Sequence, residues 1–150
     1  MGDLNGEEDF QSAFWGAKRA MMEAHEAAFR KHGVRAGQQH ILKKLWAADC
    51  QTPGELAQKL DLSVATVSKM ATRMEATGLV GRHPHPSDRR LVRVCLTERG
   101  RALQDVIGEE IQGVTERALA SLDAQQRQEL VRCLQAVRDN LDNSAVQLAS

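Results

Sequence analysis

The stretch "TPGELAQKLDLSVATVSKMATRMEATGLV", Thr52 to Val80, contains two helix-start signals eleven residues apart. At the first signal, Thr52 can cap a helix, Pro53 suits its first position and Glu55 completes a capping box. At the second, Ser63 can cap another helix after a joint of two residues. Two helices separated by so short a turn are predicted to form a helix-turn-helix.

The second of these helices has two faces of different chemistry. It is predicted to continue to Gly78, because glycine readily adopts the left-handed backbone that ends helices. At 100° per residue, the apolar side consists of Val64, Val67, Met70, Ala71 and Met74. The opposite side is small, hydroxylated and basic, and consists of Ala65, Thr66, Lys69, Thr72, Arg73 and Ala76. Such a face can approach base edges closely and reach guanine or phosphate, so it predicts DNA reading; a solvated surface helix is the alternative.

The following segment, "RHPHPSDRRLVRVCLTERG" from Arg82 to Gly100, places prolines and arginines between two β-prone runs, which predicts a β-hairpin. In its second strand Val92, Val94 and Leu96 are expected to pack, while Arg93 and Cys95 face outward. Arginines at a hairpin tip fit the narrow, electronegative minor groove of DNA. Because Asp88 would repel phosphate, we expect it to accept hydrogen bonds from Arg90 or from turn amides and to hold the tip in one shape.

Helical periodicity flanks this central part on both sides. Before it, residues 10–33 are expected to form a long helix and residues 36–48 a second one. After it, Thr97 is predicted to cap a helix reaching Ser121, and Asp123 to cap a last helix. The apolar residues of that last helix alternate at spacings of four and three, and they are Leu130, Leu134, Val137 and Leu141. This spacing is typical of a seam for a partner helix, so we expect a homodimer, with intramolecular packing as the alternative.

Length and composition agree with one domain that is mainly α with a small β wing. The chain has 150 residues, of which 42% are hydrophobic and only 3% aromatic, which suits helix packing better than a β-sandwich. Within a single domain spanning 1–150, we expect residues 36–97 to form the winged helix-turn-helix. Residues 10–33 and 98–145 are expected to be dimerisation helices.

The charge is unevenly distributed although the net charge is zero. Between Lys59 and Arg101 there are nine Lys and Arg against four Asp and Glu, an excess of five positive charges in one segment. A basic surface on an acidic remainder predicts a polyanionic partner, and a solvated charged face is the alternative.

Three other kinds of signal are weak. The three cysteines, Cys50, Cys95 and Cys133, lack CxxC spacing, so we expect ordinary thiols; a redox role for Cys50 or for Cys95, which lies beside Arg93, remains a hypothesis. The histidines show no metal-ligand spacing, and we expect no metal and no cofactor. The acidic N-terminus and the absence of a run of about 18 apolar residues predict a soluble, cytoplasmic protein.

Together these residues resemble the multiple antibiotic resistance regulator (MarR) family of bacterial transcription factors. The resemblance rests on the stretch from Thr52 to Val80 and on "DRRLVRVCLTERG", Asp88 to Gly100, which is similar to the wing of the family. It extends from about Phe10 to Leu141, and is specific in the centre and only architectural at both ends.

The resemblance implies a homodimeric winged helix-turn-helix repressor of a pseudo-palindromic operator, relieved by a small phenolic or lipophilic molecule, an oxidant or a metal. DNA contact is carried over to the recognition helix at Ser63, Ala65, Thr66, Ser68, Lys69 and Arg73. In the wing, Arg90 is expected to enter the minor groove, Arg89 to contact phosphate and Asp88 to brace the tip. Oxidant-sensing members usually carry a cysteine near the start of the first helix, and this chain has none there.

An effector pocket is suggested by large side chains between the dimer helices and the reading head, although core packing explains them equally well. They are Trp15, Met22, His40 and Trp46. An enzyme is disfavoured because nucleophile elbows and Gly-rich phosphate loops are missing from the sequence. Non-specific nucleic-acid or RNA binding is disfavoured by the zero net charge and the few aromatics. A protein-interaction module that has lost DNA binding would not be expected to keep the wing arginines.

Overall fold

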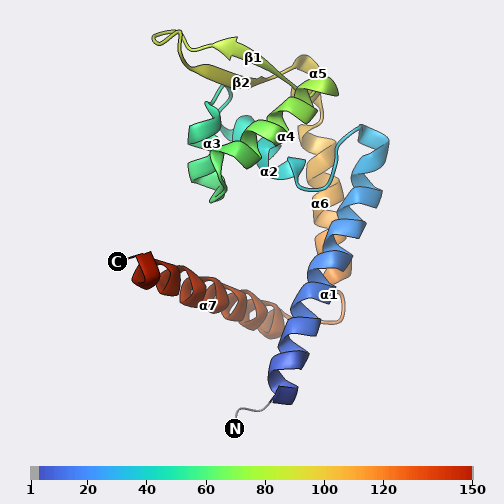
Figure 1. Ribbon diagram of the computed structural model, residues 1–150. Helices are drawn as coiled ribbons and strands as arrows, with labels where there is room; N and C mark the ends of the chain where they lie inside the picture. The colour runs from blue at the N-terminus through green and yellow to red at the C-terminus, as the bar shows by residue number, and fades with distance from the viewer. Residues whose placement is uncertain (1–3, 150) are drawn as a thin grey trace. The chain divides into compact units, whose positions relative to one another are not determined.

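The computed structural model describes residues 4–149, which form the helices and the two-stranded sheet drawn in Figure 1. By its internal contacts the chain divides into two compact units, one up to Val114 and one from Thr115. Within the described residues, no helix is both long and apolar enough to cross a membrane.

The first unit begins with α1, Leu4–Phe29, which runs into the short 3₁₀ helix η1, Arg30–His32. Gly33 ends this segment with a φ of 71°, a left-handed backbone that glycine adopts without steric cost. The long first helix is therefore confirmed, starting earlier than expected and ending in a tighter turn.

The helix-turn-helix consists of α2, Gln38–Ala47, α3, Pro53–Leu60, and α4, Val64–Ala76. The capping box at the start of α3 is present, since Thr52 and Glu55 each accept the other's backbone N–H at 3.1 Å. The three helices close over a core whose fully buried side chains include Phe29, Ile41, Leu42, Leu45, Leu56, Val67 and Met74. Both cap signals thus mark real helix starts, and the apolar periodicity marks the real core.

The wing consists of β1, Val80–Pro84, and β2, Val92–Leu96, which pair antiparallel with Val80 opposite Leu96 and Pro84 opposite Val92. The joint between α2 and α3 lies along β2, because Gln51 and Val94 exchange backbone hydrogen bonds of 3.0 and 2.7 Å. Beside them, the N–H of Leu96 donates to Oδ1 of Asp49 at 2.8 Å. The wing is therefore anchored to the helix-turn-helix at its base.

The structure overturns three expectations about β2, namely an outward-facing Cys95, ordinary thiols at residues 50 and 95, and a packed Val92. Cys95 is only 5% exposed and is disulfide-bonded to Cys50, so the expectation of ordinary thiols is wrong for both residues. Residues 50 and 95 stand next to the hydrogen-bonded Gln51 and Val94, at a position where facing backbones approach closely, and their Cα atoms are 4.1 Å apart. Val92, which was expected to pack, is 43% exposed because it lies at the outer end of β2, beyond the part of the strand that the joint covers.

The helix expected from Thr97 to Ser121 is broken into α5, Glu98–Ala102, and α6, Gln104–Ala118. Thr97 caps α5 as predicted, accepting the N–H of Gly100 at 3.1 Å. At Leu103 the backbone N–H turns to the carbonyl of Arg101 and leaves the α-helical pattern. The break follows from tertiary contacts, since the carbonyl of Gly100 is also held by the indole N–H of Trp46 at 2.9 Å.

The second unit contains the end of α6 and the helix α7, Ala124–Ala149. Asp123 accepts the N–H of Gln126 at 2.8 Å, which confirms the predicted cap. The guanidinium of Arg127 donates to the carbonyls of Leu119 and Leu122 at 2.9 Å each, closing the turn before the helix.

Substitution of Gly100 by alanine is expected to destabilise the first unit by about 2 kcal/mol, in the range of overpacked core positions. A Cβ at this position would lie 2.2 Å from the carbonyl oxygen of Leu79, a backbone atom that cannot swing away. Urea unfolding followed by circular dichroism measures the loss. The matched control is Gly108→Ala on α6, where a Cβ meets no atom within 4 Å; equal stability of Gly100→Ala and the parent would contradict this packing.

Candidate nucleic-acid interface

The recognition helix α4 presents the predicted polar face to solvent. Ser63 caps it by accepting the N–H of Thr66 at 3.1 Å, and the two hydroxyls lie 2.8 Å apart. Its buried side consists of Val67, Ala71 and Met74. The residues of the predicted reading face are all exposed, namely Ala65, Thr66, Lys69, Thr72, Arg73 and Ala76. The separation of the two faces is therefore confirmed, whereas Val64, placed on the apolar side, is 52% exposed because α4 enters the core only from Val67 onward.

Two cations of this face have no acidic partner. Within residues 4–149, neither Lys69 nor Arg73 forms a salt bridge. Ser68, also predicted to contact DNA, is half-buried and its carbonyl is occupied by a hydrogen bond from the wing. The exposed ammonium and guanidinium groups are therefore available to an external polyanion.

The tip of the wing is held by a local network around Asp88. Its carboxylate accepts the backbone N–H of Arg90 at 3.0 Å and two guanidinium N–H groups of the same residue at 3.1 Å each. The carbonyl of Asp88 also accepts the N–H of Leu91 at 3.0 Å, and the N–H of His85 closes the loop on the carbonyl of Leu91 at 2.9 Å. The expected hydrogen bonds from Arg90 to Asp88 are thus present.

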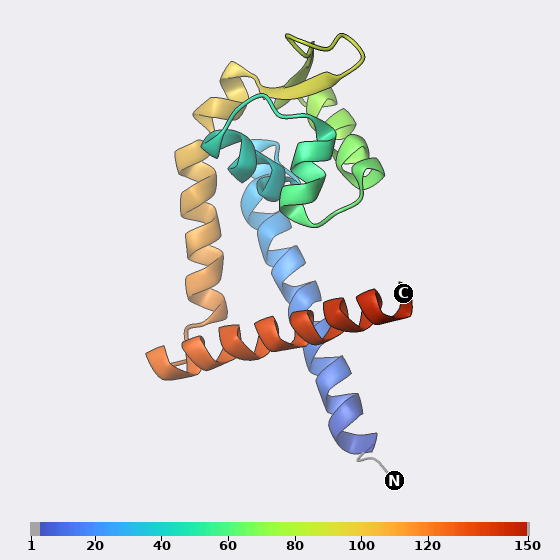
Figure 2. The ribbon, with the colours of Figure 1, turned by 90° about the vertical axis from the view of Figure 1, so that its left-hand side faces the viewer.

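These hydrogen bonds also stabilise the charged forms of both side chains at the tip. The guanidinium of Arg90, followed by its backbone N–H, lowers the pKa of Asp88, and Asp88 in turn raises the pKa of Arg90. The side chain of Arg90 remains 90% exposed, while Arg89 beside it is also exposed. In both views of the ribbon the tip stands clear of the helices (Figures 1 and 2), so these cations can meet a partner without rearrangement of the helix-turn-helix.

Arg82 links the wing to the recognition helix, a role that the sequence analysis did not assign. Its guanidinium donates to the carbonyl of Ser68 at 3.1 Å and to the hydroxyl of Thr72 at 2.8 Å. Its backbone N–H donates to Glu75 at 3.2 Å. The acceptors on residues 68, 72 and 75 follow helical spacing along one side of α4. This spacing, together with an arginine in β1, is the only feature of the sequence that could have predicted the link.

Replacement of Arg82 by methionine is expected to increase amide hydrogen exchange in β1 about fivefold, because exposed charged hydrogen bonds of about 1 kcal/mol are lost. Methionine keeps the aliphatic length and removes the donors. Exchange measured by mass spectrometry on the wing peptide reports the change. Arg117→Met on α6 removes the same charge from the second unit, and matching exchange in the two variants would exclude the link.

The four residues proposed for an effector pocket differ in exposure and in hydrogen bonding. Trp46 is partly buried against the core, with its N–H donated to Gly100. Trp15 is 55% exposed on α1, donates to Gln11 of the same helix at 2.9 Å and has Lys18 over its ring. Met22 is 43% exposed, and His40 is exposed on α2.

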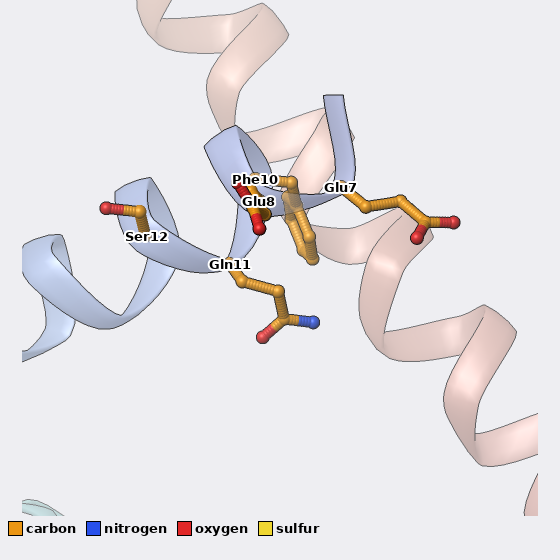
Figure 3. A pocket seen from close by; sticks show the side chains of 5 residues that line it. All are labelled: Glu7, Glu8, Phe10, Gln11 and Ser12. Atoms are coloured by element: carbon orange, nitrogen blue, oxygen red, sulfur yellow. The ribbon is translucent and has the colours of Figure 1, made fainter. Parts of the chain in front are cut away.

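Two hollows on the surface of the described residues have other linings. One is lined by Glu7, Glu8, Phe10, Gln11 and Ser12, neighbouring residues of α1 (Figure 3). The other lies between α4, the start of α3 and the wing, and is lined by Pro53, Ser68, Lys69, Thr72, Arg82 and Val92. The first lacks convergent groups from other elements, and the second belongs to the basic surface described above.

Unfolding free energy is expected to fall as the pH drops below about 6.5, with His25 as one cause. Burial, then His40 and Lys43, lower the pKa of His25 in the fold. The unfolded chain therefore binds protons first, so stability is complete above pH 6.5 and is lost as pH falls toward the lowered pKa. Urea unfolding at pH 7.5 and pH 5 measures the loss. His25→Gln is expected to reduce it, while an identical loss in that variant would rule His25 out.

Comparisons with known proteins match this architecture. The sequence model of the MarR family matches residues 35–92. Among curated proteins, the uncharacterized HTH-type transcriptional regulator YdgJ of Bacillus subtilis is 28% identical over 111 residues, which are 74% of this chain and 68% of that protein. The chain spans from about half to two thirds of the length of the curated relatives that it matches.

Solved structures extend the match to nearly the whole fold. A MarR transcriptional regulator from Methanosarcina mazei superposes with a TM-score of 0.75 at 25% identity, covering 89% of this chain and 96% of that one. A mutant MarR from Escherichia coli, solved with operator DNA, gives a TM-score of 0.79 at 23% identity and covers 91% and 99%. With its winged helix-turn-helix, the chain shares the fold of these MarR regulators, its residues 35–92 match the MarR family model, and the curated relatives that it resembles are named transcriptional regulators.

Proposed function

We propose that the chain is a sequence-specific regulator that binds a pseudo-palindromic operator as a homodimer. In each protomer, α4 enters a major groove and the wing enters the flanking minor groove. One observation carries the proposal. A single folded unit exposes the small, hydroxylated, basic face of α4 together with a hairpin tip, and the arginine of this tip is hydrogen-bonded to Asp88. In addition, the related mutant MarR of Escherichia coli was solved with operator DNA.

Each predicted residue has a specific role in this arrangement. Ser63, Ala65, Thr66, Ser68, Lys69 and Arg73 are assigned to the major-groove contact. Arg90 is assigned to the minor groove, because its pairing with a carboxylate keeps the remaining guanidinium donors in a fixed orientation. Arg89 is assigned to a phosphate contact.

The proposed dimer is supported by large apolar side chains that are exposed to solvent in the single chain. On α7 the exposed members are Leu130, Val131, Leu134, Leu141, Val146 and Leu148. On α1, Phe10, Trp15 and Met22 are also exposed. Monomeric proteins rarely leave so many large apolar residues uncovered, and residues 10–33 and 98–145 are therefore assigned to dimerisation. A dimer has twice the 16.6 kDa mass of the chain, which light scattering measures directly.

Repression relieved by a small lipophilic or phenolic effector is the proposed mode of action. Binding that covers a promoter represses transcription, and two relatives are named repressors. A site including Trp15, Met22, His40 and Trp46 is proposed for the effector. The regulator acts where the chromosome lies, in the cytoplasm.

Selection of bound sequences from a random duplex pool, followed by footprinting, tests the proposal. Enrichment of a pseudo-palindrome with half-sites about one helical turn apart is expected, with protection of the flanking minor grooves. Uniform, salt-sensitive binding without enrichment would reduce the basic surface to a non-specific electrostatic contact and would overturn the proposal.

A further inference from the structure

The disulfide between Cys50 and Cys95 joins the two parts of the molecule that are assigned to DNA. Cys50 lies in the joint directly before the Thr52 cap of α3, and Cys95 lies in β2 of the wing. The two residues are 45 positions apart in the sequence. A covalent bond here ties the base of the wing to the start of the helix-turn-helix.

The surrounding residues hold Cys50 in position for this bond. Its backbone has a φ of 57°, a left-handed conformation that is unfavourable for a residue with a β-carbon. Asp49 accepts its N–H at 2.8 Å and is itself paired with Arg101 at 3.1 Å. On the other side, the side chain of Gln51 donates to the carbonyls of Lys44 and Ala48 at 3.0 and 2.6 Å.

Access to the two sulfurs is unequal. Cys95 is 5% exposed, whereas Cys50 is only half-buried. The attack of a small thiolate is therefore assigned to Cys50, the more exposed residue of the pair, with Cys95 as the leaving group. Disulfides of cytoplasmic proteins are usually transient or redox-sensing, so a pair in this place calls for a role beyond stability.

We propose that Cys50 and Cys95 form a reversible thiol–disulfide site that responds to low-molecular-weight thiols, and that its oxidised form favours operator binding. The effect on DNA rests on the proposed function. The bond restricts the wing before DNA is bound, so less conformational freedom is lost on binding. After reduction, only hydrogen bonds hold β2 to the joint, so the strand can move more freely.

Reduction of the disulfide consumes two thiol molecules. One thiolate attacks the sulfur of Cys50, the disulfide breaks, and Cys95 leaves as a thiolate that takes up a proton. A second thiol then attacks the mixed disulfide on Cys50 and releases the low-molecular-weight disulfide. In total, two electrons and two protons pass from two thiols to the protein, and oxidation by the same disulfide reverses both steps.

The test uses the full chain with Cys133→Ser, which removes the exposed thiol of α7 and keeps the pair. The protein is equilibrated in glutathione buffers of graded redox ratio, trapped by alkylation and weighed by mass spectrometry. Operator affinity of the oxidised and reduced forms is measured by fluorescence anisotropy. We expect about tenfold tighter binding by the oxidised form, a moderate coupling between sites. Since coupling is reciprocal, saturating operator must shift the redox equilibrium constant by the same tenfold.

Cys50→Ser is the matched variant, because it cannot form the bond, leaves the buried Cys95 unchanged and must bind with the lower affinity in every buffer. Full alkylation of both cysteines after equilibration in oxidised glutathione would overturn the site, and equal operator affinity of the two forms would overturn its regulatory effect. A redox response that persists in Cys50→Ser would also contradict it.

If selection recovers no operator, the proposed function fails separately and a readout without DNA still decides the redox site. Amide exchange of Val94 and Leu96, whose N–H groups bond to the joint at 2.7 and 2.8 Å, is then expected to be slower in the oxidised form. Identical exchange in both forms would refute wing restriction.

Discussion

Arg90→Ala is expected to weaken operator binding about 100-fold and to leave the fold intact. A specific arginine contact to DNA is worth about 1–3 kcal/mol, and a twofold-symmetric dimer loses it twice. The side chain is 90% exposed and contributes nothing to the core, so the thermal unfolding of the variant should match that of the parent. Fluorescence anisotropy with the selected operator measures the affinity.

Two neighbouring variants separate the possible reasons for such a loss. Asp88→Ala removes the brace but leaves the arginine, so we expect a milder loss through disorder of the tip. Arg89→Ala is expected to weaken binding to all sequences alike and to lower the slope of affinity against salt by about one phosphate contact per protomer. Equal affinity of Arg90→Ala and the parent would refute the assignment of Arg90 to the minor groove.

Cys50→Ser is expected to lower the free energy of unfolding by about 4 kcal/mol. The bond joins residues 45 positions apart, and closing a loop of that length removes about this much entropy from the unfolded chain. Cys50 is the better residue to change, since a hydroxyl in place of the buried Cys95 would add a desolvation cost. Urea unfolding at fixed protein concentration measures the difference, because dimerisation would otherwise alter the apparent stability.

Two controls isolate the bond from the side chain. Dithiothreitol should destabilise the parent by the same amount and should leave Cys50→Ser unchanged. Cys133→Ser, on the exposed face of α7, should shift stability by no more than about 0.5 kcal/mol. A parent that keeps its stability in the reductant would show that the bond does not stabilise the fold.

Local sequence patterns were sufficient to predict most of the helices, their caps and the face that α4 exposes. Thr52, Ser63, Thr97 and Asp123 were each predicted as caps and each accepts a backbone N–H three residues later. These features involve residues three or four positions apart, whose proximity is imposed by the 3.6-residue helical repeat. The hydrogen bonds from Arg90 to Asp88 were predictable for the same reason, because only two positions separate the residues.

The contacts that connect these elements became known only from the folded chain. The bond from Cys50 to Cys95, the link from Arg82 to α4 and the break at Leu103 all depend on packing between separate segments. Alternation in β2 predicted an outward Cys95, but a strand's two faces are known only once its neighbours are known. Local periodicity carries no information on which distant backbone will lie alongside. That choice is made by burial of the shared core, which brings the joint at Gln51 against Val94.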